Sequence, residues 1–223
     1  MSNSTRDQFN DLLRSEGLNA GIIPVSNIPN EESRLNEVNR LGILNRDLDQ
    51  EAQYNALTQL AAIITKSQIG LINILGSNIQ QCKTNFGFNV LESTLTEEMP
   101  REISICQYSL ASPQEPLIIN DLFLDERTKH FKKLEAYENL RFYAGSPLIS
   151  SRGFSIGTLC VIDDKPKKIE HDQIEGLRLL ADQVVNMLEQ EFNDNSNQNI
   201  DPKDISNVIE TNRITKYLSL IHI

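Results

Sequence analysis

Several features that mark common protein classes are scarce in this chain of 223 residues. No apolar run is long enough to span a bilayer, and the polar residues 1–10 contain no apolar core of a secretory signal peptide. Basic residues number 21 against 31 acidic ones, so the formal net charge is −10. This charge argues against a general surface for nucleic acids or anionic membranes. We therefore expect a cytoplasmic protein with no nucleic-acid partner and no membrane contact by this segment.

Cysteine and histidine are also scarce, with three residues of each type. Cys82, Cys106 and Cys160 lie far apart in the sequence and form neither a CxxC pair nor a metal-ligand spacing. In a reducing compartment we expect three reduced thiols and no metal site. His171 and Asp172 resemble a kinase phospho-acceptor pair, but the proline that follows in such helices is absent. We interpret His171 as an exposed residue in the first turn of a helix, and we expect no catalytic residues.

Composition divides the chain into segments. Residues 1–32 are polar and contain two prolines, which predicts a flexible N-terminal arm with one weak helix over Arg6–Glu16. A folded domain is predicted for residues 33–191. Residues 192–204 are rich in Asn, Asp and Ser, a composition that buries too little apolar surface to stay ordered. They predict a polar linker.

The end of the chain carries two further segments. Spaced apolar residues in 205–217 predict the start of an exit helix or of a next domain. Residues 218–223 read LSLIHI and resemble the translation of a transposase adapter used in sequencing libraries. We interpret these six residues as an artefact and exclude them from fold reasoning. On that interpretation, we expect the natural protein to continue beyond Tyr217.

Hydrophobic periodicity predicts helices at both ends of the domain and strands between them. Asp47–Lys66 and His171–Gln190 carry apolar residues at spacings of three and four, as amphipathic helices do. Ile69–Leu75 and Ile79–Thr84 flank the turn sequence GSN and predict a hairpin. The other strand candidates are Pro116–Asn120, Ser146–Ile149 and Ser155–Ile162, of which the last two predict a second hairpin. Hairpins between terminal helices favour an α+β sandwich over a doubly wound parallel sheet.

Five separated blocks resemble motifs of bacterial GAF domains. In chain order they are Glu31 with Arg34-Leu35 and Leu41–Leu44, then Leu60–Ala62, Pro100–Cys106, Arg141–Leu148, and Gly153 with Ile156–Asp163. The resemblance implies a central antiparallel sheet of five or six strands. It also implies that the N- and C-terminal helices of the domain pack side by side on one face. A pocket is implied on the other face, under the irregular middle segments.

The resemblance implies a sensory or regulatory input module of a larger bacterial signalling protein, not an enzyme. It further implies a linked output domain, a histidine kinase in preference to a diguanylate cyclase. A small-molecule ligand and a homodimer formed through the framing helices are also expected. The ligand stays unidentified. Pigment-binding relatives attach their chromophore to a Cys followed by His, whereas Gln107 follows Cys106 here, and the cyclic-nucleotide-binding pattern is not found.

Six residues are candidates for lining the implied pocket: Cys106, Tyr108, Asp121, Arg141, Phe142 and Tyr143. We interpret Cys106 as a small buried hydrophobe, because reactivity would need exposure and a neighbouring cation. Arg141 has two interpretations. It reaches an anion in the pocket, or it pairs with Asp121, Asp125 or Asp163 to hold the middle segment down, and we favour the pairing.

Two alternatives to a ligand sensor remain open. In the first, the chain is a ligand-free dimerisation or interaction module whose pocket is filled by Phe86, Phe88, Phe142 and Tyr143. In the second, it is an enzyme similar to the GAF-fold reductases of free methionine sulfoxide. Their chemistry needs a thiolate of low pKa and a resolving thiol. The glycine- and cysteine-rich segments of those enzymes are missing here, which argues against the second alternative.

Overall fold

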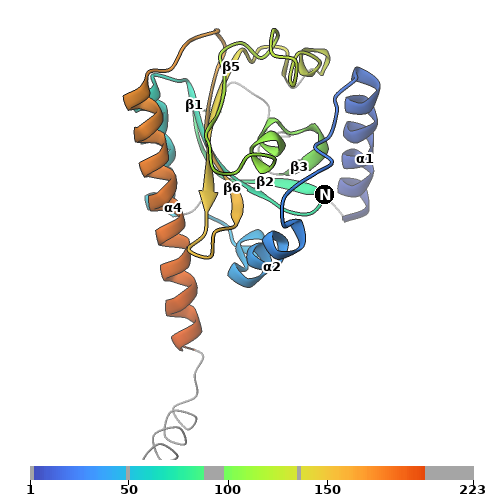
Figure 1. Cartoon of the computed structure of the whole chain (residues 1–223). Coiled ribbons are helices and arrows are strands. Elements are labelled where there is room, and N and C mark those ends of the chain that lie inside the picture. The colour runs from blue at the N-terminus through green and yellow to red at the C-terminus, as the bar shows by residue number, and fades with distance from the viewer. Residues whose placement is uncertain (1–2, 49–50, 88–97, 135–136, 199–223) are drawn as a thin grey trace, which may run out of the picture.

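A six-stranded antiparallel sheet forms the centre of the protein, as a computed structural model shows for residues 3–48, 51–87, 98–134 and 137–198 (Figure 1). The strand order is β3-β2-β1-β6-β5-β4. The strands are β1 (Ile69–Leu75), β2 (Ile79–Phe86), β3 (Glu98–Pro100), β4 (Leu117–Ile119), β5 (Phe142–Ile149) and β6 (Ser155–Asp163). Both predicted hairpins, β1–β2 and β5–β6, are confirmed.

Helices and short 3₁₀ helices cover both faces of the sheet. The α-helices are α1 (Asn3–Ala20), α2 (Glu31–Leu41), α3 (Ala52–Thr65) and α4 (His171–Gln198). The 3₁₀ helices are η1 (Ile43–Asn45), η2 (Arg101–Ile103), η3 (Ile105–Leu110) and η4 (Phe131–Lys133). As predicted, α3 and α4 pack side by side on one face. Figure 1 shows α1 on the opposite side of the sheet. No helix in the described ranges is long and apolar enough to cross a membrane.

Strand alternation divides the buried residues into two cores. The helix-face core lies between the sheet and α3 and α4, and includes Ile72, Phe142 and Leu159. The loop-face core lies under η2, η3, η4 and the end of α1, and includes Leu71 and Tyr143. Every residue of β1 is buried because this strand is central and both of its faces are covered. The predicted α+β fold is therefore confirmed.

The N-terminal segment differs from the predicted flexible arm. Here α1 spans 18 residues, well beyond the predicted helix over Arg6–Glu16. Ala20 and Ile22 are buried in the loop-face core, and the Val25 amide donates to the side chain of Gln107 at 2.8 Å. Apolar burial therefore holds this segment on the domain, although its composition is polar.

The segment predicted as a polar linker also begins differently. Helix α4 continues through Gln198, so residues 192–198 are helical. The guanidinium carbon of Arg40 lies 4.6 Å from the centre of the Phe192 ring, and this contact extends the packed part of α4. Residues 199–204, 205–217 and 218–223 lie outside the described residues, and the predicted domain boundaries remain predictions.

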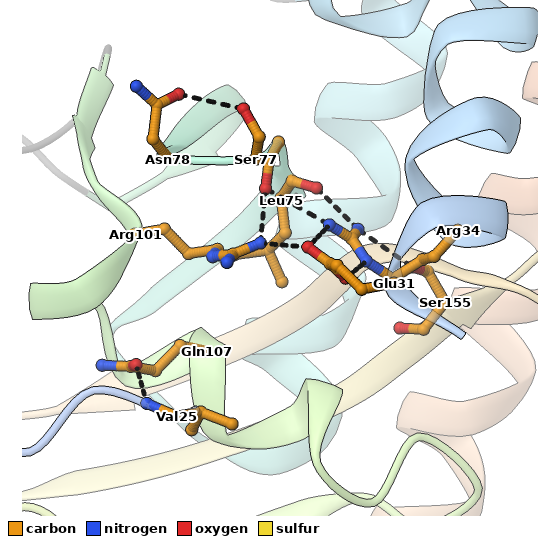
Figure 2. A network of polar contacts seen from close by, with 10 residues as sticks. Val25, Glu31, Arg34, Leu75, Ser77, Asn78, Arg101, Gln107 and Ser155 are labelled. Atoms are coloured by element: carbon orange, nitrogen blue, oxygen red, sulfur yellow. Dashed lines mark hydrogen bonds and ion pairs between the residues drawn. The ribbon is translucent and has the colours of Figure 1, made fainter. Parts of the chain in front are cut away.

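A buried arginine joins α2 to the turns of both hairpins. Arg34 is 2% exposed and donates to the carbonyls of Leu75, Gly76 and Ser155 at 2.7, 3.2 and 3.3 Å. Its guanidinium also pairs with Glu31, which accepts from Arg101 at 2.5 Å (Figure 2). The planar guanidinium spreads its five donors over a rigid fork, whereas an ammonium group holds three donors on one nitrogen. The network fixes α2, the β1–β2 turn, the start of β6 and η2 relative to one another.

Candidate functional site

A small polar cluster lies inside the loop-face core, at the centre of the sheet. We call it the thiol cluster, and it consists of Asn73, Cys106, Tyr143, Thr158 and Cys160. Four members come from the three central strands β1, β5 and β6, where Asn73 is paired with Thr158 and Cys160 with Gly145. Cys106 is added from above by η3. Strand register therefore assembles side chains that are up to 87 residues apart in sequence.

One amide group links the two sulfur atoms. Asn73 Nδ2 donates to Cys106 Sγ at 3.5 Å and to Cys160 Sγ at 3.4 Å. The Tyr143 hydroxyl donates to Cys106 Sγ at 3.3 Å. Asn73 Oδ1 and Thr158 Oγ1 are buried and have no hydrogen-bond partner among the described residues. The cluster is thus a polar site with spare hydrogen-bonding capacity in an apolar surrounding.

The hydrogen bonds shift the pKa values of the two thiols in opposite directions. The thiol of Cys160, followed in importance by donors that include Tyr143 and Asn73, lowers the pKa of Cys106 to about 7 although burial opposes this. The same contact with Cys106, together with burial, raises the pKa of Cys160 well above its ordinary value. Cys106 is therefore the more acidic thiol of the pair and Cys160 the less acidic one. The predicted burial of Cys106 is confirmed, but its surroundings are more polar than the sequence indicated.

Gly145 creates the space that the Tyr143 hydroxyl occupies. A Cβ atom at Gly145 would lie 2.4 Å from that hydroxyl oxygen, far inside van der Waals contact. The glycine of the Arg141–Leu148 block therefore allows the tyrosine to fold back along its own strand toward Cys106.

We predict that Tyr143→Phe raises the pKa of Cys106, because it removes a donor that stabilises the thiolate. The ultraviolet absorbance of the thiolate, followed as the pH is raised, measures this directly. Tyr108→Phe is the matched control. The Tyr108 hydroxyl lies 2.8 Å from the carbonyl of Arg127 and 3.2 Å from that of Ile23, and no contact of this hydroxyl with a thiol is seen in the described residues. Equal titration curves for the two variants would contradict the assignment.

Tyr108, also a pocket candidate, lies at the outer side of η3. Its ring meets Phe131 edge-on with centroids 6.3 Å apart. Burial raises its pKa to about 12, so the hydroxyl stays protonated and can donate to the carbonyls above. It ties η3 to the segments around Ile23 and Arg127 and does not reach the thiol cluster.

Asp121 and Arg141 form a two-point ion pair away from the cluster. Arg141 Nε and Nη2 lie 3.0 and 2.6 Å from the two carboxylate oxygens, and the guanidinium covers the Phe123 ring at 4.5 Å. Hydrogen bonding from Arg141 holds the pKa of Asp121 below its ordinary value. The favoured structural pairing of Arg141 is thus found. A cleft of about 440 Å³ adjoins the pair and is lined by Gln68, Gly87, Asn139 and Asp164, among others.

Phe142 does not belong to the same site as Tyr143. It is buried in the helix-face core, because adjacent residues of a strand point to opposite faces of the sheet. Its assignment to a pocket under the middle segments is therefore wrong. The same finding removes Phe142 from the four aromatics that were expected to fill the pocket together, and Phe88 lies outside the described residues.

Asn73, Thr158 and Cys160 were not among the predicted site residues, and the sequence contained signals for two of these three. Asn73 is the only polar residue in the run Ile69–Leu75, and a buried amide in such a run must find partners on one face. Cys160 alternates with Leu159 and Val161, which places it on the opposite face from them. Only the register of β1 against β6 brings the two together. Within the described ranges, no three His, Cys, Asp or Glu side chains are arranged to hold a metal ion.

Comparison with known proteins identifies the family. A family model described as GAF domain matches residues 49–188. A protein of Pseudomonas aeruginosa named cyclic di-GMP phosphodiesterase is 29% identical over 137 residues. That match covers 61% of this chain but only 22% of the relative.

Solved structures share the fold at low sequence identity. A domain of a two-component sensor histidine kinase from Sinorhizobium meliloti 1021 is 14% identical, with a TM-score of 0.53 over 67% of this chain and 97% of that one. The GAF domain of PixJ from Thermosynechococcus elongatus is 14% identical, with a TM-score of 0.54 over 75% and 95%. A free methionine-R-sulfoxide reductase from Thermoplasma acidophilum is 14% identical, with a TM-score of 0.51 over 68% and 96%. The chain belongs to the GAF domain family, whose members are generally regulatory input modules.

Proposed function

We propose that this chain is the sensory input module of a cytoplasmic signalling protein and has no catalytic activity of its own. A signal received on the loop face would change the packing of α3 against α4 and pass along α4 to an output domain. Such coupling requires the signal to bind two states of the module with different affinity.

The observation that carries this proposal is that the same strands contribute side chains to both cores. In β5, Tyr143 enters the loop-face core and Phe142 the helix-face core; in β6, Cys160 and Leu159 do the same. These strands are paired to each other along their whole length. A displacement of either strand therefore alters both faces, since densely packed interiors transmit strain.

Contacts near the far end of α4 support the direction of transmission. Glu191 pairs with Arg46 and accepts from the Tyr54 hydroxyl at 2.8 Å and from Gln53 at 3.0 Å. Tyr54 is fully buried at the start of α3, so this contact joins the two helices beside the point where α4 leaves the sheet. We call Arg46, Gln53, Tyr54 and Glu191 the exit clamp.

The output domain is proposed from two separate indications. The motif resemblance favours a histidine kinase, while the curated relative is named a cyclic di-GMP phosphodiesterase, which favours a cyclic-dinucleotide pathway. Sequencing the source locus beyond the codon for Tyr217 distinguishes them. A kinase or a cyclic-dinucleotide domain in frame would support the input role, and a stop codon there would contradict it.

Native mass spectrometry of the gently purified chain tests ligand sensing. A co-purifying small molecule that is lost on denaturation supports a sensor, and its mass identifies the class of ligand. Repeated absence of any adduct favours the alternative of a ligand-free interaction module. Turnover of free methionine sulfoxide is expected to be absent. If turnover is seen and is abolished by replacing the three cysteines, the chain is an enzyme and the proposal fails.

We also propose a homodimer through the outer side of α3 and α4. Apolar side chains are exposed there on both helices: Leu60, Ile63, Ile64 and Leu179. A patch of this kind on neighbouring helices is typical of an association surface. Ile63 is 59% exposed, so a charged residue is tolerated by the monomer but not at an apolar interface.

We predict that Ile63→Glu converts the dimer to a monomer, as measured by light scattering coupled to size-exclusion chromatography. The matched control is Leu124→Glu, because Leu124 is 76% exposed in a different part of the molecule. The control should remain dimeric. A monomeric wild type at high concentration, or the same mass for both variants, would contradict this interface.

A further inference from the structure

We propose that Cys106 and Cys160 are an oxidisable thiol pair, which a hydroperoxide converts to an intramolecular disulfide inside the loop-face core. The proposal names the chemical class of one signal, an oxidant, and its regulatory consequence rests on the proposed sensory function. The chemistry itself can be tested on the isolated chain.

The two sulfur atoms are already arranged as neighbours. Both accept from the same nitrogen, Asn73 Nδ2, at 3.5 and 3.4 Å. The three cysteines are unbridged in this structure. A disulfide requires the two sulfurs to approach to about 2.05 Å, and the approach would be made by Cys106, which the six-residue 3₁₀ helix η3 carries, toward Cys160 of β6.

The surrounding groups differ between the two thiols, so that one is favoured as the attacking thiolate and the other as the resolving thiol. Tyr143 donates to Cys106 Sγ at 3.3 Å, and Asn73 adds a second donor. These donors stabilise a thiolate on Cys106, which is the form that attacks peroxides. Cys160 Sγ accepts from the Asn73 amide at 3.4 Å, and its contact with Cys106 together with burial favours the protonated form, as suits a resolving thiol.

The proposed reaction has two balanced steps. First, the Cys106 thiolate attacks one oxygen of the hydroperoxide, so that the sulfur–oxygen bond forms and the oxygen–oxygen bond breaks. The departing alkoxide takes a proton and becomes an alcohol. If the oxidant is hydrogen peroxide, the departing hydroxide becomes water. Second, the sulfur of Cys160 attacks the resulting sulfenic sulfur; the sulfur–sulfur bond forms, and the hydroxyl leaves as water with the Cys160 proton. Two thiols lose two electrons and the peroxide gains them.

Access depends on transient opening of η3, because Cys106 and Cys160 are both buried. This helix is short, and besides its buried apolar side chains it is held by polar contacts of Tyr108 and Gln107. Gln107 donates to the carbonyl of Glu102 at 2.6 Å. It also accepts from Val25 N at 2.8 Å (Figure 2). Local opening of such elements is less costly than global unfolding. A small peroxide should therefore react where bulky alkylating agents do not.

A disulfide would draw η3 against β6. Because Gln107 ties η3 to Val25, and Arg101 of the preceding η2 belongs to the Arg34 network, the displacement would reach α2 and both hairpin turns. This is how oxidation on the loop face would be transmitted to the helix face.

The test exposes the full folded chain to hydrogen peroxide, then unfolds it in an alkylating agent and measures its intact mass. We expect a species that has lost two hydrogen atoms and takes up one alkyl group, on Cys82. Cys82→Ser, the matched control, should form the same disulfide at the same rate. Cys106→Ser and Cys160→Ser should not form it. Tyr143→Phe should slow its formation roughly tenfold below neutral pH, as expected if the pKa of Cys106 rises by about one.

Several outcomes would overturn the proposal. They are oxygen addition at Cys82 while Cys106 and Cys160 remain alkylatable, a disulfide that includes Cys82, or no change of mass in the folded chain. If a cysteine variant fails to fold, peptide mapping of the oxidised wild type still identifies the bridged pair. Hydrogen exchange of α4 separates the two claims. A disulfide that forms without altered exchange of α4 supports the thiol chemistry and contradicts its role in signalling. If another signal alters the exchange of α4 and no disulfide forms, the sensory function is supported and the thiol chemistry is contradicted.

Discussion

Replacing Arg34 with methionine should lower the free energy of unfolding by about 3–5 kcal/mol, the range found when one partner of a buried charge pair is removed. Methionine keeps much of the side-chain volume but supplies no donor. The carbonyls of Leu75 and Ser155 would lose their contacts with the guanidinium, and Glu31 would keep only Arg101 as a partner. Urea unfolding followed by circular dichroism measures the difference.

Two further variants test the cause of this loss. Arg34→Lys should recover only part of the stability, because the contacts of Arg34 are made by three different nitrogens of a planar fork, and an ammonium group has its three donors on a single nitrogen. Arg178→Met is the matched control. Arg178 pairs with Glu175 on the outer surface of α4, and such an exposed pair contributes little. If Arg34→Met unfolds at the same urea concentration as this control, water replaces the guanidinium and the network is not a structural anchor.

The same network should make stability sensitive to acid. Burial works to raise the pKa of Glu31, but the hydrogen bonds and charges of Arg34 and Arg101 outweigh it and hold the pKa below the ordinary value of 4.5. A lowered folded-state pKa means that this stabilisation is fully present above pH 4.5 and is lost as the pH falls through the folded pKa. Glu31→Gln should flatten the acid limb of the stability curve, and an unchanged acid limb would contradict the pairing.

Gly157→Ala should be the most disruptive single methyl addition to the sheet, with a cost of about 3 kcal/mol. Its Cβ would lie 2.1 Å from the backbone oxygen of Asn73 and 3.1 Å from Ile74 Cα. Backbone atoms of a central strand cannot turn aside as a flexible side chain can, so β1 and β6 would have to separate locally. Because Asn73 also holds both thiols, the variant should disturb the thiol cluster.

Gly176→Ala provides the matched control for the added methyl group. Its Cβ would meet Ile64 Cγ2 at 3.0 Å, and because that side chain is partly exposed it can shift by the few tenths of an ångström that the methyl group requires. Replacing a helical glycine by alanine gains up to about 1 kcal/mol of helix propensity. The midpoint temperature of thermal unfolding should therefore fall for Gly157→Ala and rise for Gly176→Ala. Equal shifts would show that the contact at Gly157 does not constrain the sheet.

The sequence predicted the sheet better than the site, for a physical reason. Short-range signals such as the GSN turn and the alternation in β6 decide which strands form and which faces they show. The thiol cluster depends on pairing between β1 and β6, whose residues are far apart in the chain. Because adjacent residues of a strand point to opposite faces, Phe142 and Tyr143 cannot line the same pocket. This was missed because the strand was predicted to begin at Ser146 and not at Phe142.

Residues 3–32 and 192–198 were harder to predict because tertiary contacts contribute to their structure. Their polar composition predicts little intrinsic stability. It does not reveal that Ile22 reaches the loop-face core or that Phe192 lies beside Arg40. Composition measures what a segment can bury by itself, whereas these segments are stabilised by surfaces that other parts of the chain provide.

The exit clamp gives α4 the geometry of a lever. A helix of 28 residues is about 42 Å long, and the contacts of Glu191 lie near its far end. If the contacts of the exit clamp are kept, a rotation of α4 would take place about Glu191, and the few helical residues beyond it would be displaced only a little. If the clamp opens, the pivot moves back to Leu188, the last fully buried residue before the clamp, and the same rotation gives a larger displacement at the tip. On the proposed function, the displacement at the end of α4 would therefore depend on the four side chains of the exit clamp and not on the chemistry of the signal.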